Sequence, residues 1–314
     1  MAPSVSQVEN STGFDISFDY RFDSFGFCSE EVRRALDYAA SIWEGLIHDE
    51  FPDVGLGNKF NVTNPENGSE QQLVLDAPID DILIFVGSRP DLGRESARGG
   101  YQSGSYSSIF ANRINGSDIE PYIGGIFFDR SDPWFVDNTP ETIDDIPLSS
   151  VDLISVAVHE IGHALGMNDQ SPAPILSGGL SGYNCLLVNN GNPIPYAYSG
   201  HIEEGFANDS TVMDPILARG RAYPSIYDIA WLADIGYEIW PTGGFTFAKQ
   251  GIRKPLSSPL SDTYYGIEQE DDYHGLEGDD EINGEGGDDN LNGDDGSDRL
   301  FGGLGNDNLI GGVG

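Results

Sequence analysis

The chain has 314 residues, 38% of them hydrophobic, which is enough apolar material for a substantial core and a second, smaller unit. Its 52 acidic and 15 basic residues give a formal net charge of -37, which argues against nucleic acid as a partner and favours cations such as calcium. No apolar run of about eighteen residues occurs, so we expect no membrane span. The two cysteines, Cys28 and Cys185, exclude a disulfide framework and leave either one bridge or two buried thiols.

Regular elements are predicted in the order strand, helix, strands, followed by a second helix, which is typical of an α+β domain. Residues 14–23 alternate between polar and apolar side chains and predict a strand. The next element is a helix that starts after Ser29, and residues 80–89 and 122–129 predict further strands. The apolar face of the first helix is predicted to consist of Val32, Leu36, Ala39, Ala40 and Trp43.

The second helix carries two histidines four residues apart. Residues 147–166 predict about four helical turns, with Ser149 as the N-cap. His159 and His163 leave the same face one turn apart, so both imidazoles can reach one tetrahedral metal ion. Glu160 is adjacent and can hold and deprotonate a water molecule instead of binding the metal. The flanking residues are apolar on nearly all sides, which indicates a buried helix whose polar groups need a metal or firm partners.

A third metal ligand has two candidates. Among the other histidines, His48 falls in the region of the first helix and His274 adjoins the acidic repeats, which leaves His201. Asp169 competes with it, because Gly166 can end the helix and return a side chain to the metal three residues later.

The stretch "HEIGHALGMND" resembles the extended zinc motif of the metzincin metallopeptidases. Met213, in "STVMDP", resembles the methionine of their Met-turn beneath the metal. The aspartate form of the motif, as in snapalysin-like enzymes, would make Asp169 the third ligand. The leishmanolysin-like form takes a histidine shortly before the Met-turn, and His201 lies twelve residues ahead of Met213. We favour His201 and keep Asp169 as the alternative ligand or as a partner of a ligating histidine.

Two further features are interpreted through the same resemblance. The stretch "YIGGIFFDRSDPWF" resembles the matrixin strand whose edge lies beside the active-site cleft, and its loop offers Asp129 and Asp132 to calcium. Downstream of the Met-turn, Arg221, Tyr223 and Tyr237 are candidates for substrate contact.

From Gly275 onward the sequence repeats every nine residues, as in "GLEGDDEIN" and "GEGGDDNLN". This pattern resembles the repeats-in-toxin nonapeptide, whose glycine-rich turns bind calcium while an aliphatic residue packs inside a parallel β-roll. Residues 262–314 hold sixteen acidic residues and one basic residue, so we expect folding of this segment to depend on calcium. The calcium-binding aspartates are predicted to be Asp280, Asp289, Asp298 and Asp307, and the inward aliphatic residues Ile282, Leu291, Leu300 and Leu309.

The predicted organisation is a metzincin-like catalytic domain in residues 1–240, a linker in 241–265 and a calcium-binding β-roll in 266–314, a layout that resembles the serralysins. It implies a secreted zinc endopeptidase that acts on protein or peptide substrates, with Glu160 as general base. Export by a C-terminal signal-dependent, type I-like route and a monomeric state are expected. The alternative is an extracellular calcium-dependent adhesin or matrix protein with a degenerate peptidase domain, against which an intact Glu160 counts.

Overall fold

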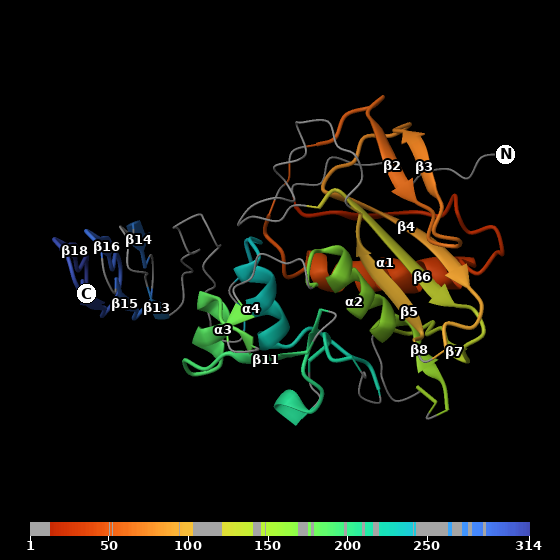
Figure 1. Cartoon of the computed structure of the whole chain (residues 1–314). Coiled ribbons are helices and arrows are strands. Elements are labelled where there is room, and N and C mark those ends of the chain that lie inside the picture. The colour runs from red at the N-terminus through yellow and green to blue at the C-terminus, as the bar shows by residue number, and fades with distance from the viewer. Residues whose placement is uncertain are drawn as a thin grey trace.

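The computed structural model of the chain describes most of the catalytic region and of the repeats (Figure 1). Most of the predicted linker lies outside the described residues, and so does Asp169. Those residues are 13–49, 51, 53–93, 95–102, 121–140, 146–147, 149–168, 175–176, 179–197, 200–208, 211–215, 220–240, 242, 263–265, 272–275, 278–284 and 287–314.

A four-stranded sheet forms the centre of the N-terminal half. Its strand order is β1-β4-β6-β5, with β1, β4 and β6 parallel and β5 antiparallel at one edge. The predicted strands at 80–89 and 122–129 are confirmed as β4 and β6, whereas the first predicted strand is shorter than the alternating stretch. The bounds are β1 Ile16–Asp19, β4 Ile82–Arg89, β5 Ala97–Tyr101 and β6 Ile123–Asp129.

Two helices, α1 (Glu30–Glu44) and α2 (Leu153–Ala164), pack on one face of this sheet (Figure 1). The predicted start of α1 is confirmed, because the Ser29 side chain accepts a hydrogen bond from the Val32 N–H, and the whole predicted apolar face is buried. Trp43 donates its indole N–H to the carbonyl of Val158 over 2.9 Å, which fixes α1 directly against α2.

The predicted N-cap of α2 is wrong by three residues. The helix starts after Asp152, whose carboxylate accepts a hydrogen bond from the Ser155 N–H, and not after Ser149. Strand β8 (Val151–Asp152) pairs with β7 (Trp134–Phe135), so the chain is still extended where the sequence pattern predicted a first helical turn.

A β-hairpin covers the opposite face of the sheet. Strands β2 (Lys59–Thr63) and β3 (Glu70–Val74) pair antiparallel, and Phe60 and Val62 pack with Phe85 of β4 in a second apolar cluster. The sheet is therefore buried on both sides over most of its area.

The chain after α2 builds a smaller subdomain around helices α3 (Tyr183–Val188) and α4 (Ile226–Asp234). Asp234 of α4 accepts hydrogen bonds from the backbone N–H groups of Asn184 and Cys185, which links the two helices. Cys185 and Cys28 are both buried free thiols. The short elements here are β9 Ile175–Leu176, β10 Gly179–Leu180, β11 Ile194–Ala197, β12 His201–Ile202 and the 3₁₀ turn Phe206–Asn208.

The repeats form two three-stranded parallel sheets in which alternate strands pair, β13-β15-β17 and β14-β16-β18. Ile282 and Leu291 are fully buried between them and Leu300 is half-buried, as the nine-residue spacing predicts, whereas Leu309 is 45% exposed. None of the described helices is long and apolar enough to cross a membrane. The strands are β13 Thr263–Tyr265, β14 Asp272–His274, β15 Glu281–Asn283, β16 Asn290–Asn292, β17 Arg299–Phe301 and β18 Asn308–Ile310.

Candidate metal centre

Three imidazole rings meet beside α2. The Nε2 atom of His201, on β12, lies 3.2 Å from Nε2 of His159 and 3.3 Å from Nε2 of His163. Three nitrogens bound tetrahedrally to one zinc ion at the usual 2.0–2.1 Å would lie about 3.3–3.4 Å apart. The three rings therefore have the spacing that a shared zinc ion requires, and they are the group of potential ligands found among the described residues.

The outer nitrogens of two of these rings are fixed by backbone carbonyls. Nδ1 of His159 lies 2.7 Å from the carbonyl oxygen of Val212, and Nδ1 of His163 lies 2.6 Å from that of Met167. A carbonyl can only accept, so each Nδ1 carries the proton and each Nε2 presents its lone pair to the centre. Burial, together with the neighbouring His163 and His201, lowers the pKa of His159 well below its ordinary value, which favours the neutral form that binds metal.

A left-handed glycine brings His201 into this position. Gly200 has φ +84°, and a Cβ atom there would lie 2.7 Å from Cα of Asn168 and 3.3 Å from Cε1 of His163. Only a glycine lets the hairpin β11–β12 approach the end of α2 so closely. In the sequence, the signal for this close approach is the glycine directly before His201.

Met213 packs against the helix that carries His159 and His163, and its turn is held by three sets of contacts. A Cβ atom at Gly162 of α2 would lie 2.7 Å from Sδ of Met213, so this methionine packs directly against the helix backbone between the two histidines. The buried carboxylate of Asp228 accepts hydrogen bonds from the N–H groups of Val212 and Met213 over 2.9 and 3.0 Å, and Ile202 N–H donates to the Met213 carbonyl. Asp228 was not predicted from the sequence, although its capping box with Ser225 at the start of α4 is a signal that could have indicated it.

Glu160 is buried between α2 and strand β5. Burial raises the pKa of Glu160 to about 8, although the backbone N–H of Gly99 opposes the shift by hydrogen bonding to the carboxylate. Oε2 is buried and has no hydrogen-bond partner among the described residues. A cation bound to the adjacent histidines would favour the charged carboxylate and supply the missing interaction.

The sheet order corrects the expected edge of the cleft. The stretch that was predicted to form this edge is β6, which lies inside the sheet, and β5 is the edge strand that packs on α2. Asp129, at the end of β6, does not offer a free carboxylate to calcium, because its oxygens accept hydrogen bonds from the N–H groups of Asp91, Leu92 and Ser131. The sequence pattern specifies neither the place of β5 at the edge of the sheet nor the backbone N–H groups that bind the Asp129 carboxylate.

The four predicted calcium aspartates lie in the turns of the repeats. Oδ1 of Asp298 accepts from the N–H of Asp280 over 2.9 Å, and Oδ1 of Asp307 accepts from that of Asp289 over 3.1 Å. Oδ2 of Asp298 is buried and makes no hydrogen bond within the described residues. Asp298 and Asp307 thus each bridge to a residue eighteen positions earlier, and the second oxygen of Asp298 remains available to a cation.

The side chain of Arg221 is completely buried and so cannot contact substrate, which corrects the expectation drawn from its place downstream of Met213. Its guanidinium donates to Asp152 over 2.7 and 3.1 Å, to Asp137 over 2.6 Å and to the carbonyl of Pro140 over 3.0 Å. Tyr237 is also buried, and its hydroxyl donates to the carbonyl of Leu165. Of the three proposed substrate contacts, Tyr223 alone is exposed.

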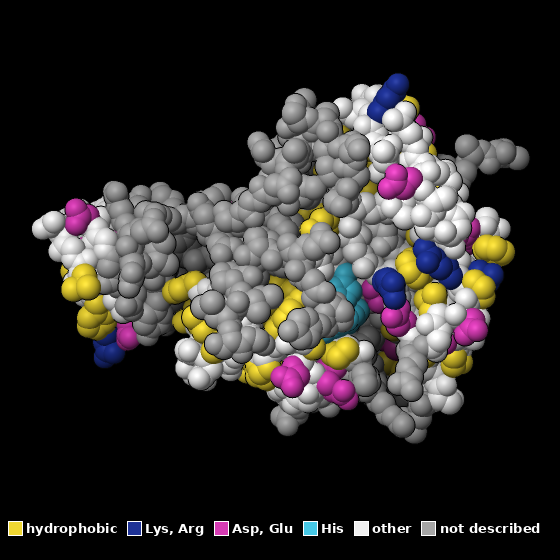
Figure 2. All heavy atoms as spheres, viewed as in Figure 1, with side chains coloured by type: hydrophobic (Ala, Val, Ile, Leu, Met, Phe, Trp, Pro, Cys, Tyr) yellow, Lys and Arg dark blue, Asp and Glu magenta, His cyan; other side chains and the backbone are white. Residues whose placement is uncertain are grey.

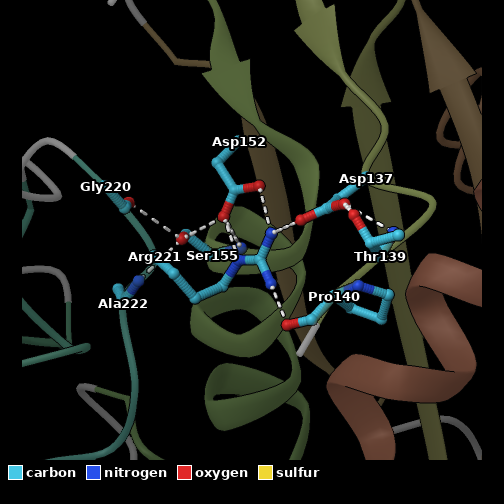
Figure 3. Close-up of polar contacts among 8 residues, drawn as sticks. All are labelled: Asp137, Thr139, Pro140, Asp152, Ser155, Gly220, Arg221 and Ala222. Atoms are coloured by element: carbon cyan, nitrogen blue, oxygen red, sulfur yellow. Dashed lines mark hydrogen bonds and ion pairs between the residues drawn. The ribbon is translucent and has the colours of Figure 1, made fainter. Parts of the chain in front are cut away.

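The Arg221 network connects the start of α2 to the chain beyond Met213. Asp152 is the N-cap of the helix and also accepts from the Ser155 hydroxyl, whose oxygen accepts from the N–H of Ala222 over 2.7 Å (Figure 3). The burial of Asp137 raises its pKa, but hydrogen bonds from Thr139 and Arg221 outweigh this effect and lower it overall. These contacts hold the first turn of α2, one turn before His159, in a fixed place.

We expect Arg221→Met to lower the free energy of unfolding by about 3–5 kcal/mol, because two buried carboxylates lose their counterion. Arg221→Lys should recover only part of this loss, since an ammonium group cannot reproduce the planar fork. Denaturant unfolding in excess zinc and calcium measures both. Arg34→Met, which removes an exposed ion pair with Glu30, is the control and should change stability by less than about 1 kcal/mol. A loss of the same small size in Arg221→Met would contradict the prediction.

Comparison with protein families gives two matches. Residues 105–176 match the family model for Matrixin, and residues 265–300 and 285–314 match that for the RTX calcium-binding nonapeptide repeat (4 copies). No curated protein matches the chain significantly. The first match includes His159 and His163 and ends before His201. The comparisons confirm the resemblance to a metzincin peptidase followed by calcium-binding repeats, and they imply zinc and calcium as the cofactors.

Proposed function

We propose that the chain is a zinc-dependent endopeptidase in which His159, His163 and His201 bind the metal. The observation that carries this proposal is the spacing of 3.2 and 3.3 Å between His201 Nε2 and the Nε2 atoms of the other two histidines. Neutral imidazole is a common zinc ligand, and sites with three protein ligands leave a fourth position for water or substrate. The matrixin match supports a metallopeptidase independently of this geometry.

Glu160 is the general base and acid in this proposal. Zinc, when bound, lowers the pKa of a water molecule and polarises the substrate carbonyl. Glu160 accepts a proton from the attacking water and transfers it to the departing amine. Its burial and the Gly99 N–H hold the carboxylate beside the histidines, where the proton transfers occur.

The repeats are proposed to be a parallel β-roll that folds around calcium. The supporting observations are the pairing of strands eighteen residues apart, the left-handed glycines of each turn and the buried Oδ2 of Asp298. Asp280, Asp289, Asp298 and Asp307 are the proposed calcium ligands. We also propose the organisation into residues 1–240, 241–265 and 266–314, and secretion of the protein as a monomer through a C-terminal signal-dependent route.

The test is metal analysis combined with digestion of casein by the full chain. We expect one zinc per chain, calcium that a calcium-selective chelator removes, and cleavage that disappears when zinc is removed and returns when zinc is added back. A calcium-dependent adhesin with a degenerate peptidase domain would contain no stoichiometric zinc and would cleave nothing. That result would overturn the proposed function.

A further inference from the structure

The edge strand β5 presents backbone groups directly beside Glu160. Asp129 N–H donates to the Ser96 carbonyl and Gln102 N–H donates to the Ile123 carbonyl, so the even-numbered residues of this segment bond to β6. In an antiparallel pair the alternate residues, here Ala97 and Gly99, direct their N–H and C=O groups away from the partner strand, and of these groups the Gly99 N–H already donates to the Glu160 carboxylate. No strand of the described part of the chain pairs with this outer side. An extended peptide can therefore add to β5 next to the proposed catalytic glutamate, through the outward groups of Ala97 and the carbonyl of Gly99.

The side chains of β5 alternate between the two faces of the sheet. Ala97 is buried and Gly99 lies against the backbone of Glu160, so both face α2. Arg98 consequently projects from the opposite face, where it is directly across from Phe127 of β6, and 63% of its side chain is exposed. A peptide strand on β5 would place one of its side chains beside Arg98, since directly opposed Cβ atoms lie about 4.5–5.5 Å apart.

A second arginine lies on the same face. The guanidinium of Arg89 lies 3.7 Å from the ring centroid of Phe127, the residue opposite Arg98. Burial, together with the positive charge of Arg98, lowers the pKa of Arg89. Arg89 over the Phe127 ring and Arg98 across from Phe127 therefore place two cations on this face of the sheet, in a chain with a net charge of -37. Figure 2 shows basic and acidic side chains together next to the visible histidine side chains.

In the structure, the guanidinium of Arg98 forms an ion pair with the carboxylate of Glu95. Its carboxylate accepts from the guanidinium at 2.7, 2.9 and 3.1 Å, and half of the Glu95 side chain is exposed. Such an exposed pair is weak and can exchange one carboxylate for another. Glu95 is therefore a competitor for any acidic group that reaches Arg98.

We propose that Arg98, supported by Arg89, is a specificity-determining residue that selects peptides with an acidic side chain at the position opposite it on β5. This inference rests on the proposed peptidase function where it is tested by peptide cleavage. A test by peptide binding does not depend on cleavage. A carboxylate and a guanidinium form a bidentate pair, which a neutral amide of the same shape cannot reproduce. Glu95 weakens this selection by competing for the same guanidinium.

The test uses peptide pairs that differ by Glu or Gln at each position around the cleavage site. For one position, the wild type should prefer the Glu peptide in kcat/KM by about three- to fivefold at low salt, mainly through KM, and less at high salt. Arg98→Gln should reduce the ratio to about one, and Glu95→Gln should increase it. Arg34→Gln changes the net charge equally and also breaks an exposed ion pair, with 58% and 85% exposed side chains, so it should keep the wild-type ratio.

Binding of the same peptides to the zinc-loaded Glu160→Gln variant, alone and combined with Arg98→Gln, separates the two proposals. A Glu preference in binding that disappears with Arg98→Gln supports the subsite even if no peptide is cleaved, and the missing cleavage would then count against the peptidase alone. An equal Glu-to-Gln ratio with and without Arg98 in both assays overturns the subsite. A ratio lost equally in Arg34→Gln would also overturn it, because the preference would then reflect net charge.

Discussion

Replacing Glu160 by glutamine is expected to lower kcat by about a hundred- to ten-thousandfold while zinc content and stability stay at the wild-type level. Proton transfer by a positioned side chain contributes about this much to an enzymatic rate. The amide has nearly the same shape and its oxygen can still accept from the Gly99 N–H, but it cannot take a proton from water. Turnover of casein or a peptide, measured together with zinc content, gives the result.

The control for Glu160→Gln is the same change at Glu44. This carboxylate is partly buried in α1, accepts a hydrogen bond from the Ile16 N–H, and lies in a helix outside the histidine cluster. Glu44→Gln should keep turnover within about twofold, since surface and half-buried polar changes away from the site act mainly on stability. If Glu160→Gln retained a tenth or more of the wild-type activity at neutral pH, Glu160 would not be the general base.

Local signals in the sequence predicted that both helices exist, but they did not predict the order of the strands in the sheet or the residue at which α2 begins. The start of α1 follows from Ser29 and an apolar stripe, both of which act within a few residues. The N-cap of α2 depends on the pairing of β8 with β7, seventeen residues earlier, and a pattern of local propensities contains no information on that pairing. The same limit explains why β6 was expected at the edge of the sheet, where β5 lies instead.

In the candidate site, too, the sequence predicts what local geometry fixes and does not predict the contacts that come from distant parts of the chain. The spacing of His159 and His163 is fixed by helical geometry, so the sequence alone places them on one face. The partners that orient them are backbone groups of Val212 and Met167, which no side-chain pattern reveals. Arg221 shows the converse, because a charged residue shortly after Met213 was expected to contact substrate, whereas the structure pairs it with two buried carboxylates.

The choice of third ligand leads to the second large effect. His201→Ala is expected to weaken zinc binding by more than the roughly 10- to 100-fold that the loss of an outer partner of a ligating histidine costs. His201 Nε2 lies 3.2–3.3 Å from the two other Nε2 atoms, and the left-handed Gly200 and the hydrogen bond from Ile202 N–H to the Met213 carbonyl hold its strand in place. Three converging nitrogens would then be reduced to two.

Asp169→Ala is the decisive comparison, because Asp169 follows the end of α2 closely and lies outside the described residues. As a partner of a ligating histidine it would contribute up to about 100-fold in affinity, and as the ligand itself it would contribute more. Zinc content and zinc affinity of both alanine variants should be measured with His48→Ala as the control, since His48 packs against Trp240 and is not part of the three-histidine group. We expect zinc loss to be much greater in His201→Ala than in Asp169→Ala, and none in His48→Ala. Loss of zinc in Asp169→Ala with full retention in His201→Ala would move the site to the aspartate form of the metzincin motif, because a histidine that is not a ligand can be removed without opening the metal site.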